Sequence, residues 1–174
     1  MRFECLIAGE GPEREPLESL IRKNGLQERV RLLGHIDRPG MDSLYAHADV
    51  VVLTSRSEGI PLVLMEAMIR SRVVVAPAIT GIPEIIIPGK TGFLYEPGDL
   101  QDFVNRILFL ETLLHSEDRY ARSALHWIQH AARVHVLHNF GRRENLNQFA
   151  NQFLQRIATE DRSSSHEDFV LQQI

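Results

Sequence analysis

The amino-acid sequence predicts an α/β fold, in which a doubly wound parallel sheet is followed by a helical C-terminal part. Short apolar runs with the length of strands alternate with helical patterns over the first 98 residues, as is typical of parallel sheets covered by helices on both faces. From Asp99 onward only helical patterns remain. Right-handed crossovers place the carboxyl ends of parallel strands along one edge, so the loops that leave at Gly9, Gly34, Thr54 and Pro77 are expected to share a crevice.

The individual elements follow from apolar spacing and turn residues. Leu17, Leu20 and Ile21 recur at helical spacing, and Gly25 closes that helix. Pro97 stops the fifth strand. The expected strands are residues 3–8, 29–33, 50–53, 73–76 and 91–95. The expected helices are residues 13–24, 41–47, 61–70, 99–115, 118–138 and 142–158, with a single helical turn at 82–86.

Length and composition narrow the class of protein. A chain of 174 residues fits one domain, or one domain with an appendage, and 44% hydrophobic and 24% charged residues are typical of a globular protein. The net charge of −4 does not favour nucleic acid or an anionic membrane. No apolar run approaches the roughly 18–20 residues of a spanning helix, so a cytoplasmic protein is expected. Cys5 is the only cysteine and cannot form an intrachain disulfide.

Two glutamates, Glu58 and Glu66, stand at the boundary between the third expected strand and the following helix. A carboxylate at the exit of a strand and another one turn into the next helix can face one crevice, and the N–H groups of the helix start suit an anion. Gly59 lets a ligand approach the backbone, and Pro61 fits the first helical position. Carboxylates for hydroxyls beside amides for phosphate indicate a nucleotide-sugar site. The alternative is a pair of solvated, helix-forming glutamates, although Glu66 lies in an apolar helix where a carboxylate requires a partner.

Two glycine-containing segments carry weaker signals. Gly9 and Gly11 match two glycines of a dinucleotide-binding fingerprint, but Arg14 occupies the third position, so a tight strand-to-helix turn is favoured over NAD binding. Gly81 follows the fourth strand and could allow a ligand to approach closely in the same crevice. Glu84 fits either a ligand contact or a carboxylate that interacts with a helix dipole.

His126 and His130 are spaced like two metal ligands on one helix face. The residue that follows His126 is not the Glu of a metalloprotease motif, and no third ligand of clear geometry lies nearby. A solvated helix face is therefore favoured, and no metal site is predicted.

Taken in order, these motifs resemble the C-terminal, donor-binding half of a GT-B glycosyltransferase, specifically glycosyltransferase family 4 (glycosyl transferases group 1). The resemblance implies a Rossmann-like fold and covers about residues 3–110. Any one motif alone is weak, and the specificity comes from their order. The matching pieces are Leu6–Pro12, Val30–Ile36, Leu44–Val50, Ser55–Gly59, Leu64–Met68, Gly81–Ile85 and Gly89–Leu94.

The resemblance makes Glu58 and Glu66 the two acids of the family's E-x7-E motif. In the family the first acid contacts the transferred sugar, which makes Glu58 the candidate catalytic residue, and the second holds the ribose hydroxyls of the donor. Backbone amides between them meet the sugar or its phosphates. Members transfer a sugar with retention of its anomeric configuration, from a nucleotide diphosphate sugar as donor substrate, with no cofactor and no bound metal. The implied donor-binding residues are Glu58, Gly59, Ile60, Leu62, Val63, Glu66 and Gly81, with Gly34, His35 and Ile36 against the nucleobase.

The chain departs from the family pattern at several positions. Ser71 and Val73 stand where a Gly and a Pro usually occur, and Ser71 is expected in a left-handed helix cap. Thr80 replaces the first glycine of a frequent Gly-Gly pair. Pro61 has no N–H, so one amide contact of the loop is absent.

The largest departure is the absence of the family's acceptor domain and of the first strand and loop of its donor-binding domain, whose Arg and Lys hold the diphosphate. The resemblance places that strand in the middle of the sheet, between the strands that start near residues 3 and 50. Either these two strands pair directly, or another chain supplies the missing strand, since an open edge invites association. Exposed apolar residues on the C-terminal helices would favour a partner or a dimer.

The sequence therefore predicts residues 1–98 as a Rossmann-like donor-binding domain that lacks its first βα unit, 99–160 as a helical appendage and 161–174 as a disordered tail. The expected function is the nucleotide-sugar-binding half of a retaining glycosyltransferase, which transfers a hexose from a nucleotide diphosphate sugar to an acceptor and is inactive without the acceptor half. The alternatives are a donor-binding subunit of a split transferase, a non-catalytic remnant that binds a nucleotide or only a protein, and a fragment of a longer chain.

Overall fold

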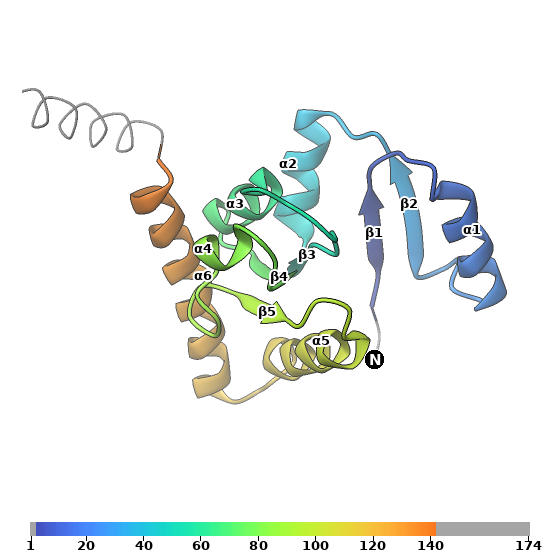
Figure 1. The fold of residues 1–174 in the computed structure, drawn as a ribbon. Helices are drawn as coiled ribbons and strands as arrows, with labels where there is room; N and C mark the ends of the chain where they lie inside the picture. The colour runs from blue at the N-terminus through green and yellow to red at the C-terminus, as the bar shows by residue number, and fades with distance from the viewer. Residues whose placement is uncertain (1–2, 142–174) are drawn as a thin grey trace, which may run out of the picture.

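The computed structural model describes residues 3–141, which form an α/β fold with parallel strands. Strands and helices alternate as far as β5, and two long helices follow (Figure 1). The strands are β1 (Cys5–Ala8), β2 (Val30–Gly34), β3 (Val50–Val52), β4 (Val73–Pro77) and β5 (Phe93–Tyr95). The helices are α1 (Arg14–Lys23), α2 (Arg38–His47), α3 (Leu62–Ile69), α4 (Ile82–Ile85), α5 (Leu100–Leu114) and α6 (Arg119–Asn139).

The strands form two separate parallel sheets instead of one. β1 pairs with β2, whereas β3, β4 and β5 form a three-stranded sheet with β4 at its centre. Cys5 lies opposite Val30 in the first sheet, and Val50 lies opposite Val73 in the second. Direct pairing of β1 with β3, one of the two arrangements expected from the sequence, is therefore not found within residues 3–141.

The break between the two sheets lies between β1 and β3. The chain passes from β1 to β2 in the first sheet and from β3 through β4 to β5 in the second, and β1 is the strand of the first sheet on the side of β3 (Figure 1). In a doubly wound fold the strand order reverses beside a central strand, and the two strands that flank this central strand do not pair with each other. A strand supplied by another chain, the second arrangement, stays a prediction.

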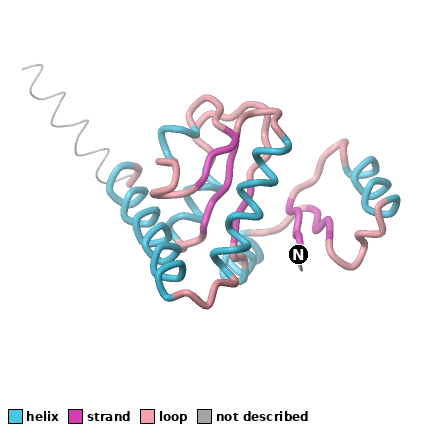
Figure 2. Tube along the Cα trace, turned by 90° about the horizontal axis from the view of Figure 1, so that it is seen from below, coloured by secondary structure: helices cyan, strands magenta, loops and turns pink. Residues whose placement is uncertain are grey.

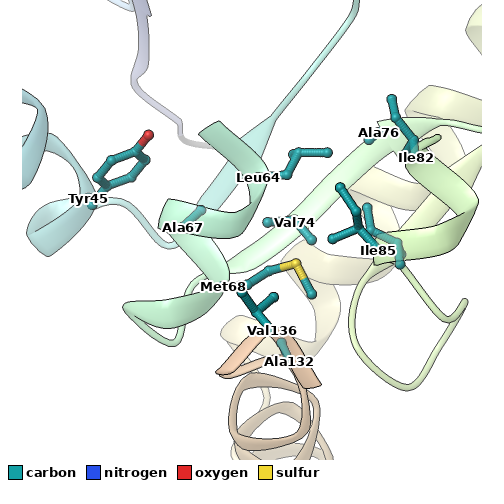
Figure 3. Close-up of a cluster of buried hydrophobic side chains, with 11 residues drawn as sticks. Tyr45, Leu64, Ala67, Met68, Val74, Ala76, Ile82, Ile85, Ala132 and Val136 are labelled. Atoms are coloured by element: carbon teal, nitrogen blue, oxygen red, sulfur yellow. The ribbon is translucent and has the colours of Figure 1, made fainter. Parts of the chain in front are cut away.

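The central strand β4 is buried along its whole length because helices cover both faces of its sheet. Side chains of a strand alternate between the faces. Val74 and Ala76 pack in a cluster with residues of α3, α4 and α6, and Val73 and Val75 pack with Leu110 of α5. Figure 3 shows the first cluster, where α6 packs against α3. The two helices that follow residue 98 thus share the core of this sheet.

The N-terminal unit, residues 5–34 with β1, α1 and β2, is built differently. Gly34 is its only buried residue, and α1 has none. Leu6 and Leu20 keep 39% and 55% of their surface exposed. In two perpendicular views the unit stands beside the three-stranded sheet and its helices (Figures 1 and 2). One helix covers one face of this small sheet, so its apolar side chains are only partly removed from water.

Most helix ends lie close to the expected positions, but α2 begins at Arg38, three residues before the start of the helix expected over 41–47. Pro61 is the N-cap of α3 and not its first residue, a shift of one position from the prediction. Ser71 has φ of 57°, which confirms the left-handed cap expected there. The expected helix 142–158 and the tail 161–174 lie outside the described residues. Of the helices in the described part, none combines the length and apolar character that a membrane span requires.

Candidate functional site

The loops that follow β3 and β4 meet at the carboxyl edge of the three-stranded sheet. Thr80 donates a hydrogen bond from its hydroxyl to the main-chain oxygen of Glu58. A Cβ on Gly81 would lie 2.6 Å from the main-chain oxygen of Gly59, so the loops touch through their backbones. The φ of Gly81 is an ordinary −76°, and glycine is required there by this close approach. The structure therefore brings Gly81 beside the Glu58 loop, as the sequence predicted.

The carboxylate of Glu58 is half-buried and is held from its own loop. Ser55 donates a hydrogen bond from Oγ to Oε1 of Glu58 over 2.6 Å, a length typical of a hydroxyl bound to a charged acceptor. Thr80, which clamps the same residue, has φ of 40°, in the region that favours glycine. Thr80, in a backbone conformation that favours glycine, thus anchors the loop that carries Glu58 through a hydrogen bond.

The second carboxylate, Glu66, is half-buried on α3 between fully buried residues of that helix. Tyr45 of α2 donates its phenolic hydrogen bond to Oε2 of Glu66 over 3.1 Å. Burial, followed by the hydrogen bond to Glu66 and its negative charge, raises the pKa of Tyr45 far above its ordinary value, so this donor keeps its proton. Glu66 therefore has the hydrogen-bond partner that a carboxylate in an apolar helix requires.

Between the two glutamates lies the N-terminus of α3. The helix begins at Leu62 after the N-cap Pro61, and no side chain caps it. The side chains of Ile60 and Leu62 are 47% and 68% exposed, and Gly59 is exposed as well, whereas Val63 is half-buried. The first N–H groups of a helix have no intrahelical acceptor and lie at the positive end of its dipole. This loop and helix start offer backbone donors to an anion.

The segment predicted to contact a nucleobase lies at the end of β2. Gly34 is buried with φ of 73°, and a Cβ at this position would collide with the side chain of Glu10. His35 is exposed and Ile36 is half-buried. Asp37 then caps α2 by accepting from the N–H of Gly40 over 2.9 Å. The segment thus belongs to the other sheet, on the N-terminal side of the break.

A cavity of about 220 Å³ opens within the N-terminal unit, lined by residues of β1, β2, α1 and the turn between β1 and α1. The turn is the tight one that the sequence predicted, with Gly9 at φ of 137°. The cavity is separate from Glu58 and Glu66, neither of which lines it. It offers a concave surface on the N-terminal unit, apart from the carboxylate pair.

The other weaker candidates lie at exposed positions. His126 and His130 are exposed on α6, and no group of three metal-ligating side chains occurs among residues 3–141. Glu84 is exposed in the first turn of α4, where a carboxylate interacts favourably with the helix dipole.

Sequence reasoning missed two side chains that hold the carboxylates, Ser55 and Tyr45. A signal existed for Tyr45, because it shares one face of α2 with Met41 at i,i+4 spacing and both pack in the buried cluster. A buried tyrosine needs a partner for its hydroxyl. Which partner it finds depends on how α2 packs against α3, and the local sequence does not carry that information.

The model of the family described as "Glycosyl transferases group 1" matches residues 2–127 of this chain. The match includes both sheets, the loops that carry the two glutamates, and the first part of α6.

Two relatives among well-described proteins illustrate the similarity. The chain is 36% identical over 108 residues to an alpha-D-kanosaminyltransferase of Streptomyces kanamyceticus, a match that covers 60% of this chain and 28% of that protein. It is 41% identical over 113 residues to the sulfoquinovosyl transferase SQD2 of Arabidopsis thaliana, which covers 63% of this chain and 21% of that protein. The chain thus spans less than a third of the length of these relatives.

Solved structures show the same fold. A glycosyltransferase from Rickettsia africae superposes with a TM-score of 0.75 at 23% identity, over 88% of this chain and 40% of that one. The HepE protein of Anabaena, solved in complex with UDP, superposes with a TM-score of 0.71 at 26% identity, over 88% of this chain and 41% of that one. A further structure of HepE contains UDP-glucose.

Proposed function

The chain belongs to the glycosyl transferases group 1 family, and on this premise we propose that it binds a nucleotide diphosphate sugar at the loops that follow β3 and β4. In this proposal Glu58 contacts the sugar, Glu66 holds the ribose hydroxyls, and the start of α3 faces the diphosphate. The bound donor serves the transfer of a hexose with retention of its anomeric configuration.

The observation that carries the proposal is the pair of anchored carboxylates at one edge of one sheet. Glu58 is held by the hydroxyl of Ser55, and Glu66 by the hydroxyl of Tyr45. An ionised carboxylate has about four acceptor sites, and one protein donor uses only one of them. Both residues therefore keep acceptors for the hydroxyl groups of a ligand, in a conformation that the protein has already fixed.

The diphosphate has a matching surface in the uncapped N-terminus of α3. Its first N–H groups and the positive end of the dipole suit a phosphate, and exposed Gly59 lets the ligand approach the backbone. The complexes of the related HepE structures with UDP and UDP-glucose support this class of ligand.

Sugar transfer asks for more than donor binding. The acceptor hydroxyl must be aligned with the anomeric carbon, and the charge that develops there must be stabilised away from water. We assign donor binding to this chain and propose that it turns over only when an acceptor-binding half completes the cleft.

Isothermal titration calorimetry with UDP-, GDP-, ADP- and TDP-sugars tests the assignment. We expect heat of binding with at least one donor, and about 10- to 100-fold weaker binding for Glu66→Gln, because hydrogen bonds to a charged group contribute about 1.5–3 kcal/mol. Glu84→Gln is the matched control, since it removes the same charge from an exposed site on nearby α4. Absence of heat with every donor, or equal effects of the two variants, would exclude the proposed site.

Within residues 3–141, β1 and β3 each leave one edge unpaired, which favours a second candidate, a donor-binding subunit whose sheet is completed by another polypeptide. Light scattering after size-exclusion chromatography, followed by transferase assays on mixing with a co-purified protein, checks this. Activity only in the mixture supports a split transferase, and activity of the isolated chain contradicts it.

A further inference from the structure

Tyr45 is the most deeply buried polar side chain that contacts the candidate site. It is 3% exposed and packs in the buried cluster with Leu64, Ala67 and Met68 of α3. Figure 3 shows its ring on the Ala67 side of that cluster. Leucine or phenylalanine would fill such a position without a hydroxyl that needs a partner. Packing alone therefore does not account for a hydroxyl group at this position.

That hydroxyl has one proton and two acceptors within reach. It lies 3.1 Å from Oε2 of Glu66 and 3.5 Å from the main-chain oxygen of Val63. The shorter contact is also to the charged acceptor, which forms the stronger hydrogen bond. Because Tyr45 keeps its proton over the physiological range, as its raised pKa indicates, Oε2 of Glu66 always faces a donor.

A third residue fixes both members of the pair. The guanidinium of Arg70 lies over the Tyr45 ring, 5.0 Å from its centroid, and donates to the main-chain oxygen of Glu66 over 3.0 Å. The second terminal nitrogen of the Arg70 guanidinium forms an ion pair with Asp42 of α2. The ring of Tyr45 and the backbone that carries Glu66 are thus held in one arrangement across α2 and α3.

The consequence concerns the oxygen that Tyr45 leaves unused. With Oε2 engaged, the Glu66 side chain is confined to few rotamers, and its Oε1 keeps its acceptor sites. Confining a flexible side chain before binding spares an ordering cost that corresponds to about a 2- to 12-fold difference in affinity. A fixed carboxylate oxygen suits a vicinal pair of hydroxyls, which must be met at a defined distance and angle.

We propose that Tyr45 is a positioning residue for the ribose of the donor, acting through Glu66: its hydroxyl holds Oε2 so that Oε1 is presented to the 2′ and 3′ hydroxyls of the nucleotide. This inference rests on the proposed function, because it takes Glu66 as the ribose ligand. Tyr45 itself does not touch the donor.

The test compares nucleotides that differ only in those hydroxyls. Calorimetry measures the Kd of UDP, GDP and ADP and of their 2′,3′-dideoxy forms for the full chain and for Tyr45→Phe. We expect Tyr45→Phe to weaken the preferred ribonucleotide about 2- to 12-fold and to leave the dideoxy form within about 2-fold. A merely structural role of Tyr45 would shift both forms alike.

Tyr95→Phe is the matched control, because Tyr95 is also buried and donates its hydroxyl hydrogen bond to the main-chain oxygen of Leu53 over 3.2 Å. It should change neither Kd by more than about 2-fold. In the Glu66→Gln background, the added Tyr45→Phe change should have no further effect if the two residues act as one unit. Thermal unfolding followed by circular dichroism shows that each variant is folded.

The outcomes separate the two claims. If the wild-type chain binds and Glu66→Gln weakens the ribonucleotide, but Tyr45→Phe affects both nucleotide forms equally or neither, the positioning role is wrong and donor binding stands. If the wild-type chain binds none of the six nucleotides, the proposed function fails and the positioning role fails with it.

Discussion

The N-terminal unit and the three-stranded sheet contain similar apolar strands and reach very different degrees of burial. Every residue of β4 is buried, whereas β1 alternates between half-buried and exposed positions and α1 has no buried residue. Both regions follow the βα pattern of a parallel sheet. The difference lies in the layers around them, because α5 covers one face of the larger sheet and α3, α4 and α6 cover the other, whereas a single helix lies on the smaller sheet. An apolar run thus predicts a strand, while its burial depends on what packs against it.

Leucine truncation gives the largest expected contrast between the two regions. Leu110→Ala in α5 should lower the free energy of unfolding by about 2–5 kcal/mol, because Leu110 is 1% exposed and its removal leaves a cavity beside β4 and β5. Leu20→Ala in α1 makes the same chemical change at 55% exposure, and its effect should stay within about 0.5 kcal/mol. Urea unfolding followed by circular dichroism measures both. Equal losses would mean that the N-terminal unit is buried against another surface in solution.

Glycine substitution is the next contrast in size. A Cβ on Gly92 would lie 2.6 Å from a methyl carbon of Val74 and 3.0 Å from its main-chain oxygen, so Gly92→Ala should cost about 1–3 kcal/mol. Gly11 in the N-terminal unit has nothing within 4 Å of such a Cβ. Gly11→Ala should leave the free energy of unfolding unchanged or raise it by up to about 1 kcal/mol. A loss at Gly11 as large as at Gly92 would contradict the open packing of the N-terminal unit.

The smallest expected effect concerns Ser71, a residue with an unfavourable backbone conformation within the well-packed region. Ser71 ends α3 in the left-handed conformation, where glycine avoids the steric cost of a Cβ. Ser71→Gly should therefore raise the free energy of unfolding by about 0.5–1 kcal/mol and the Tm by a few degrees. Ser123→Gly, at an exposed position inside α6, should lower the free energy of unfolding by up to about 0.5 kcal/mol, because glycine is a weaker helix former than serine. Calorimetric melting distinguishes them, and a loss at both sites would refute the strain argument.

Much of this fold could be predicted because the ends of its helices and strands are set by the backbone preferences of single residues. Gly9, Pro61 and Ser71 mark the ends of elements through their own backbone preferences, and each lies within one residue of the expected boundary. Whether β1 and β3 pair with each other could not be predicted, because the sequence of each strand fits a paired and an unpaired strand equally well. Pairing depends on which neighbour is available, and that information is not local.

The candidate site likewise combines features that the local sequence predicts with features that depend on tertiary packing. Glu58, Gly59 and Glu66 were recognisable from their spacing around one strand-to-helix turn. The donor that holds Glu66 was not, because Tyr45 reaches Glu66 only through the packing of α2 on α3. Glu58 is held within its own loop by Ser55, whereas the orientation of Glu66 is a tertiary property.

We propose that the donor binds at the carboxyl edge of the three-stranded sheet and not in the cavity of the N-terminal unit. Chemical-shift mapping of backbone amides in the ¹⁵N-labelled chain, titrated with the nucleotide sugar that gives the most heat, tests it directly. We predict the largest shifts at residues 58–60, 62–66 and 80–81, with further shifts at Gly34–Ile36. Shifts confined to the residues that line the cavity between β1 and α1, with the signals of residues 58–66 unchanged, would exclude donor binding at the three-stranded sheet.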